Sequence, residues 1–130
     1  MKNHAVDPAA LERIGHVLEE KGELIGLSLQ ACAHCSFCAE SCFLYRSSGR
    51  DPRWSPAYKA LNSIGPIARE KGMLPEAQWE TIRELVFDRC VLCMRCQCPV
   101  GISIPSLIAA ARRACREKGV QRWYTTRKNA

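Results

Sequence analysis

The chain has 130 residues, a formal net charge of +6 and nine cysteines. This length favours one small domain, or two linked lobes, with a modest hydrophobic core. The opening residues, MKNHAVDPAALERIGH, lack the apolar segment of a signal peptide, and no apolar run approaches the roughly 20 residues of a membrane span. We therefore expect a cytoplasmic protein without a membrane span, in which the cysteines bind metal and do not form disulfides.

The first predicted element is a helix over about residues 8–22. Asp7 and Pro8 suit the N-cap and the first helical position, and apolar residues follow at helical spacing. The next segment, GELIGLSLQA, is predicted to be a loop or a short helix. It leads directly into the first of two cysteine-rich segments.

Proline marks the helices that separate the two segments. Ser55 and Pro56 predict a short helix that runs to about Ile64 and stops at Gly65-Pro66. A second short helix is expected over 67–71. Pro75 then opens a longer helix, PEAQWETIRELVFDR, whose apolar residues share one face.

The last predicted helix, IPSLIAAARRACREK, begins after Ser103 and ends at Gly119. The remaining tail, 120–130, is basic and is expected to be mobile apart from Trp123. No segment shows the alternation of a strand. The sequence thus predicts an all-α fold, organised as a single domain over 1–130 with two cysteine-rich loops.

Eight of the nine cysteines form two runs. The first, CAHCSFCAESC, has the spacing C-x2-C-x2-C-x3-C. The second, CVLCMRCQC, begins in the same way but ends two residues early. Three thiolates at this spacing can surround a four-iron cluster, and in two-cluster ferredoxins the fourth cysteine of each run binds the other cluster. Cluster one is therefore assigned to Cys32, Cys35, Cys38 and Cys98, and cluster two to Cys90, Cys93, Cys96 and Cys42.

The short spacing before Cys98 constrains the second run. The Cα atoms of Cys96 and Cys98 can be at most about 7 Å apart, against about 13–14 Å for the usual four-residue step. The backbone must therefore bend at Gln97, and Pro99 biases Cys98 toward extended geometry. We expect a complete but compressed site. The alternative is that one of the two cysteines is spare and one cluster is atypical.

A zinc site fits the two cysteine runs less well than iron–sulfur clusters do, and the remaining candidate residues are not expected to bind metal. A zinc site of four thiolates would use only half of the eight cysteines. His34 lies inside the first loop but is not expected to bind iron, and His4 and His16 are expected to face solvent. Cys115 is expected to be a half-buried residue of the last helix, and Trp79 a core residue.

The charges also have two interpretations. A net charge of +6 could indicate a nucleic-acid partner. Each oxidised cluster with four thiolates carries about −2, however, so two clusters would bring the total to about +2. No nucleic-acid partner is therefore expected. Arg46, Arg89 and Arg95 flank the cysteines, where they either face solvent or favour a reduced cluster.

The stretches LIGLSLQACAHCSFCAESC, RDPRWSPAYKALNSIG and CVLCMRCQCPVGISIP resemble the helical ferredoxin family. They are most similar to the C-type subunits of heterodisulfide reductase and of its relatives in sulfur-oxidising bacteria, over roughly residues 24–118. The resemblance implies two four-iron clusters that relay electrons from one partner to another, the partners being a flavoprotein and a catalytic iron–sulfur protein. The chain departs from the family at Phe43, where many relatives have proline, and in the spacing before Cys98. The family's ligand roles carry over to Cys32, Cys35, Cys38, Cys42, Cys90, Cys93 and Cys96.

The chain lacks the adjacent cysteine pair of the catalytic partner and a glycine-rich dinucleotide loop. We therefore expect a non-catalytic electron-transfer component of an oxidoreductase complex. The same module occurs in succinate and glycerol-3-phosphate dehydrogenases, which form the nearest alternative. An alternative of another class is an iron–sulfur regulator that binds DNA through the stretch ARRACREKGVQRWYTTRK. Two fully ligated clusters argue against this alternative.

Overall fold

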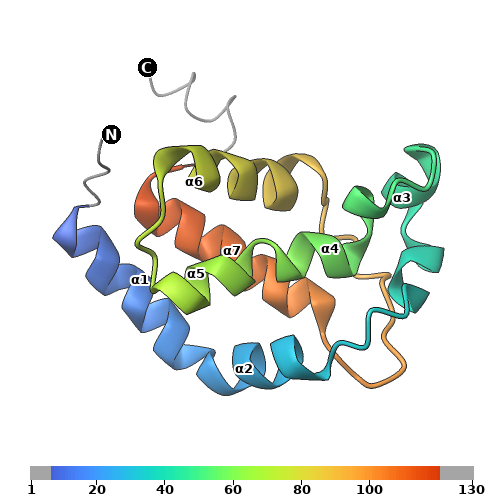
Figure 1. Cartoon of the computed structure of the whole chain (residues 1–130), viewed down its shortest axis with the longest axis horizontal. Helices are drawn as coiled ribbons and strands as arrows, with labels where there is room; N and C mark the ends of the chain where they lie inside the picture. Colours follow the sequence, from blue (N-terminus) through green and yellow to red (C-terminus); the bar gives the residue numbers. More distant parts are fainter. Residues whose placement is uncertain (1–6, 121–130) are drawn as a thin grey trace.

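A computed structural model of the chain describes residues 7–120, and this part is helical without a strand (Figure 1). The fold is all-α, as the sequence predicts. His4 and the predicted tail beyond Val120 lie outside the described residues. The elements in chain order are α1 (Pro8–Glu20), α2 (Gly22–Ala31), η1 (Phe37–Ser41), α3 (Phe43–Ser47), η2 (Pro52–Trp54), α4 (Pro56–Leu61), α5 (Ile64–Glu70), α6 (Glu76–Arg83), η3 (Glu84–Asp88) and α7 (Ile104–Lys118).

Helix α7 forms the centre of the fold, with α1, α4, α5 and α6 packed around it (Figure 1). Its inward residues, among them Leu107, Ile108 and Ala111, are buried with Trp79 and Ile14 in one hydrophobic core. The two cysteine-rich loops lie together at one end of this bundle, beside α3 (Figure 1). The bundle is thus a rigid support for loops that come from distant parts of the sequence.

The predicted helix ends are largely confirmed. The Asp7 carboxylate accepts a hydrogen bond from the Ala9 amide at 3.3 Å, and Ser55 Oγ accepts one from the Tyr58 amide at 3.1 Å. Gly119 has φ +100° and its amide donates to the Cys115 carbonyl at 2.9 Å, which closes α7 in the way that favours glycine. Ser103 precedes α7 as expected, but its side chain makes no capping hydrogen bond.

Residues 22–31 form a full helix, α2, where the sequence predicts a loop or a short helix. The first helix correspondingly ends at Glu20, and Lys21 separates the two. Helix α2 buries Ile25 and Ser28 and packs against α5. Tertiary packing, together with the helix-forming leucines of this segment, decides the conformation.

The break between the two middle helices lies earlier in the sequence than predicted, so the predicted position is wrong. Helix α4 ends at Leu61 and α5 begins at Ile64, so Gly65 and Pro66 lie inside the first turn of α5 and do not stop a helix. In a continuous helix the ring of Pro66 would clash with the carbonyl of Asn62. In the first turn Pro66 has no such conflict, because amides there have no partner within the helix. Proline here marks a helix start.

The helix that begins after Pro75 changes its winding before it ends. Residues 76–83 are α-helical, whereas Glu84–Asp88 form a π-helical turn. The Arg89 amide donates to the Glu84 carbonyl, five residues earlier, at 3.0 Å. Such turns are rare in proteins overall, but those that occur often lie at functional sites. This one directly precedes Cys90.

Candidate cluster-binding site

The two cysteine runs have the same unusual backbone. In the first, His34 and Ser36 have φ of 57° and 66°, and in the second, Leu92 and Met94 have φ of 53° and 68°. Each pair occupies the same two positions around the middle cysteine of its run. Left-handed backbone is costly for residues other than glycine and clusters at functional sites. The two runs therefore share one loop conformation around their middle cysteine.

The runs differ from the residue before their third cysteine onward. In the first, η1 supplies a helical turn between Cys38 and Cys42. In the second, no helical turn separates Cys96 from Cys98, and the chain turns immediately afterwards, where the Gly101 amide donates to the Cys98 carbonyl at 3.0 Å. The shorter spacing thus replaces a helical turn by a single intervening residue, Gln97.

One cavity collects thiols from both runs. Cys42 of the first run and Cys90, Cys93 and Cys96 of the second all line it. Its remaining walls are largely apolar and come from α3, α4, the second loop and the start of α7. These four cysteines are the predicted ligands of cluster two. Apolar walls that limit the access of water are typical of such sites. The other lining residues are Phe43, Leu44, Pro56, Lys59, Val91, Leu92, Met94, Ile104, Pro105 and Ile108.

A second group of thiols surrounds Cys38. Burial raises the pKa of the Cys38 thiol, a hydrogen bond from the Ala57 amide lowers it, and the neighbouring Cys32 and Cys98 raise it. Cys98 therefore lies near cysteines of the first run, as its predicted role in cluster one requires. Cys35, the fourth cysteine of this predicted set, is exposed.

Cys96 belongs to the other group. Burial raises the pKa of its thiol to about 11, and Cys90, Cys38 and Cys93 add to the effect. Cys96 thus lies among the thiols of its own run and also near Cys38, and Cys38 in turn has Cys98 as a neighbour. Which irons these cysteines bind stays a prediction.

The donor chemistry fits four-iron clusters. All nine cysteines are free thiols, which as thiolates are the ligands of such clusters. Within residues 7–120, no three side chains of His, Cys, Asp or Glu are placed to hold a single metal ion. The residues that would hold a cluster are those of the cavity, Cys42, Cys90, Cys93 and Cys96.

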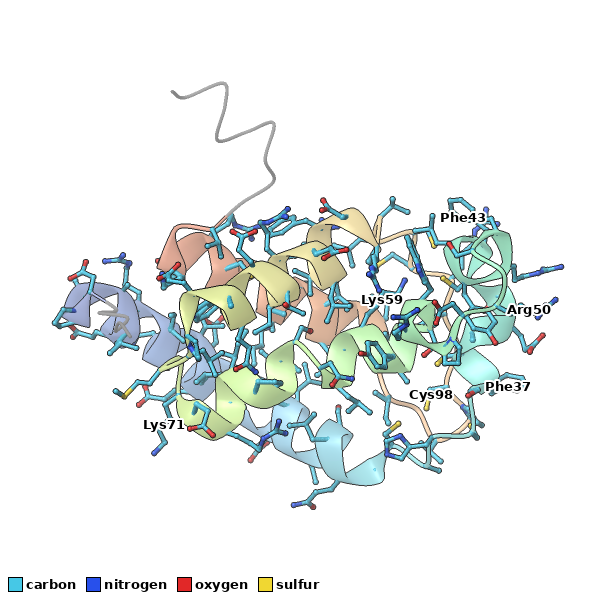
Figure 2. All side chains as sticks on the ribbon, turned by 45° about the horizontal axis from the view of Figure 1, so that its top comes forward. Phe37, Phe43, Arg50, Lys59, Lys71 and Cys98 are labelled. Carbon is cyan, nitrogen blue, oxygen red and sulfur yellow. The ribbon has the colours of Figure 1, made fainter. Side chains whose placement is uncertain are left out.

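Helix α4 lies between the two groups of thiols and contacts both. The Ala57 amide hydrogen-bonds the Cys38 sulfur, and Lys59 Nζ lies 3.8 Å from Cys42 Sγ. Lys59 also donates to the Arg89 carbonyl at 2.5 Å. In Figure 2 Lys59 lies inside the molecule, toward the end that carries Cys98 and Phe43. Helix α4 thus supplies one polar donor to a ligand of each predicted centre.

The second loop begins at a point that α7 holds in place. Arg112 donates from Nε to the Val86 carbonyl at 2.7 Å and from Nη2 to the Cys90 carbonyl at 2.6 Å. Its guanidinium also lies over the Phe87 ring, 5.0 Å from the centroid. The π-helical turn leaves carbonyl groups without a hydrogen bond inside the helix. The planar guanidinium of Arg112 donates to two carbonyl groups at once.

The remaining candidates are placed mostly as predicted. His16 and His34 are exposed, and Trp79 is fully buried in the core. Cys115, predicted to be half-buried, is instead fully buried, because it lies on the inner face of α7.

The three flanking arginines differ from one another. Arg46 and Arg95 are exposed. Arg89 is engaged within the fold, since its guanidinium pairs with Glu84 at 3.1 Å and lies 4.9 Å from the centre of the Trp54 ring. Arg89 is connected to the site through its backbone carbonyl, which accepts a hydrogen bond from Lys59.

Sequence reasoning missed Lys59, Ser41 and Arg112. Ser41 Oγ donates to the Arg95 carbonyl at 2.7 Å and so joins the two loops. No motif marks any of these residues. A usable signal exists only for Lys59, which interrupts the apolar face of α4 four residues before the buried Ser63.

The fold and the paired loops define an all-α cluster-binding protein. A family model described as a 4Fe-4S dicluster domain matches residues 28–102. The match contains both cysteine runs and the helices between them, and the chain belongs to this family. No curated protein and no solved structure matches the chain significantly.

The chain is thus an iron–sulfur protein of the ferredoxin kind, with an electron-transfer role and four-iron, four-sulfide clusters as its cofactors. Within residues 7–120, no helix is both long enough and apolar enough to cross a lipid bilayer.

Proposed function

We propose that the chain carries two four-iron clusters and relays electrons within a complex of the heterodisulfide reductase type. The observation that carries the proposal is the repeated backbone of the two loops, with left-handed residues at matching positions, together with the cavity that both loops line. When bound, each cluster supplies a one-electron redox centre. Cluster one is assigned to Cys32, Cys35, Cys38 and Cys98, and cluster two to Cys90, Cys93, Cys96 and Cys42.

The partners in this proposal are the flavoprotein and the catalytic iron–sulfur protein of a heterodisulfide reductase-like complex in the cytoplasm, which serves the oxidation of sulfur compounds. The chain itself performs no substrate chemistry. Its part is to hold two redox centres close together by loops that one hydrogen bond, from Ser41 to Arg95, connects. Nine free thiols require a reducing compartment, which supports the cytoplasmic assignment.

The surface beside the clusters supports docking of a redox partner. Phe37 and Phe43 are 53% and 58% exposed, and Val91 and Met94 are 52% and 70% exposed. Phe37 and Phe43 lie at the cysteine end of the molecule (Figure 2). Phe43, Val91 and Met94 line the same cavity, and exposed apolar groups gathered in one place are typical of interaction surfaces.

Three of the four basic side chains of α7 argue against the DNA-binding alternative, whereas the fourth, Arg116, is exposed. Arg112 holds two carbonyl groups inside the fold, Arg113 pairs with Glu20 at 2.8 Å, and Lys118 pairs with Glu76 at 2.7 Å. Cations that are already paired are poorly placed to neutralise phosphates.

The test is an anaerobic purification from the native host under mild conditions. We expect a brown protein with about eight irons per chain, which elutes with a flavoprotein. Stoichiometric zinc without iron would contradict electron transfer. Iron with a succinate or glycerol-3-phosphate dehydrogenase as partner would instead favour the nearest alternative complex.

A further inference from the structure

Lys59 is the only charged side chain that is buried within residues 7–120, with 2% of its surface exposed. An ammonium group without a counter-charge is costly to bury. The described part of the chain offers Lys59 no carboxylate. Its hydrogen-bond partners there are the Arg89 carbonyl and Cys42 Sγ. The site therefore contains a buried positive charge that needs a negative one.

Of these two partners only Cys42 can supply that negative charge. A carbonyl oxygen is neutral, whereas cysteine binds a metal centre as the thiolate. The distance of 3.8 Å from Nζ to Cys42 Sγ is within the range of a hydrogen bond to sulfur. Cys42 is itself buried and lines the cavity with three cysteines of the second run. The counter-charge of Lys59 is thus a ligand of the predicted cluster two.

The predicted cluster one has no equivalent cation among the described residues. Its buried ligand, Cys38, receives a hydrogen bond from the neutral Ala57 amide of the same helix. Among the flanking arginines, Arg46 and Arg95 are exposed and therefore screened by water, and Arg89 is paired with Glu84 at 3.1 Å. The two loops repeat each other in backbone, but the charges around them differ.

We propose that Lys59 is a positioning residue that makes the centre bound by Cys42 the easier of the two to reduce. Reduction adds one electron and one negative charge and breaks no bond, and a fixed buried cation stabilises that charge more than water-exposed groups do. An electron that enters from a redox partner therefore rests on the Cys42 centre. This inference rests on the proposed function, because it requires both clusters.

The test is a redox titration of the anaerobic holoprotein with dithionite, followed by electron paramagnetic resonance. Lys59→Met keeps the length of the side chain and removes its charge. We expect the equilibrium constant for reduction of the Cys42 centre to fall at least about tenfold, which is about 59 mV for one electron. Lys59→Arg, which keeps the charge, should move it much less. The signal that Cys98→Ser disturbs identifies the other centre.

Lys71→Met is the matched control, because it removes the same charge from an exposed position at the opposite end of the molecule (Figure 2). It should leave both potentials unchanged. Two intact clusters with no shift in Lys59→Met, or an equal shift of both centres, would overturn the inference while the proposed function stands. Absence of iron from the unaltered protein would instead overturn the proposed function.

Lys59→Gln covers the case in which Lys59→Met does not assemble, because it keeps a hydrogen-bond donor without the charge. The same tenfold fall is expected. If both neutral variants lack iron at the Cys42 centre and Lys59→Arg retains it, Lys59 serves assembly, and the inference about the potential is wrong.

Discussion

Ser41 and Arg95 connect the two cluster loops, since Ser41 Oγ donates a hydrogen bond of 2.7 Å to the Arg95 carbonyl. The two residues are far apart in the sequence, and each lies beside a predicted ligand of a different run. Ser41 precedes Cys42, and Arg95 precedes Cys96. Any displacement of one loop is thereby transmitted to the other.

Replacing Ser41 by alanine should loosen this connection. We expect a loss of about 1 kcal/mol in the free energy of unfolding and faster release of iron to a chelator, measured by the loss of visible absorption. Ser47→Ala is the control, because Ser47 makes only a local contact of 3.4 Å to Leu44. Equal rates of iron release in the two variants would contradict a role for the Ser41 hydrogen bond.

Substitution of Arg112 should lower the stability of the protein far more than substitution of its neighbour Arg113. Arg112→Gln leaves the carbonyl groups of Val86 and Cys90 without their donor, which should cost about 2–4 kcal/mol. Arg113→Gln removes only a partly exposed ion pair and should cost about 0–1 kcal/mol. Chemical denaturation of the two holoproteins measures the difference. Similar losses in both variants would show that the carbonyl contacts contribute little.

Cys98 decides whether the compressed second run is complete. If Cys98 binds cluster one, Cys98→Ser should disturb the signal of that cluster in electron paramagnetic resonance and leave cluster two largely intact. Cys115→Ser is the control and should preserve both signals. Two unchanged four-iron signals in Cys98→Ser would show that Cys98 is not a ligand.

Cys115 makes stability depend on pH in the alkaline range. Burial raises the pKa of its thiol to about 12 in the folded protein, whereas an unfolded thiol titrates near 8.5. The neutral thiol therefore contributes stability that is fully present below about pH 8.5 and is lost as the pH rises toward 12.

The unaltered protein should consequently lose stability relative to Cys115→Ala above pH 9, by up to about 1.4 kcal/mol per pH unit. Urea denaturation at several pH values measures this difference. Parallel stability curves from pH 8 to pH 11 would contradict the burial argument. Iron content should be the same in both proteins at neutral pH.

Removal of the clusters should unfold the loops before the bundle. The left-handed residues of the two runs are strained, and without metal nothing offsets this cost. We expect residues 32–42 to be the most exposed part of the apoprotein, with rapid chymotryptic cleavage at Phe37. Equal resistance of apoprotein and holoprotein to the protease would disprove this dependence.

Local chemistry was sufficient to predict most helix ends. Short motifs identify these ends because each depends on one residue. Asp7 and Ser55 cap their helices with their own side chains, and Gly119 ends α7 because glycine adopts the left-handed backbone. The start of α5 escaped prediction because Pro66 can follow a helix or lie in its first turn, and only the packing of Ile64 and Ile67 into the core decides between them.

The cysteine pattern predicts a set of ligand residues, which stays a prediction, and it carries no information on their surroundings. The positions of left-handed backbone within each run depend on how the loop closes around its centre. Lys59 and Arg112 act across distances of many residues, and their partners are backbone carbonyl groups, which leave no trace in the sequence. Such contacts become visible only when the helices are placed.

The anchoring of Cys90 by Arg112 has a consequence for the order of biosynthesis. The ribosome releases the first cysteine run long before Cys98 and Arg112 exist, yet each proposed centre draws ligands from both runs. A nascent chain therefore cannot complete either proposed centre until the second run has emerged, and until then it exposes several free thiols to oxidants. Arg112 can hold the Cys90 carbonyl only once α7 has followed.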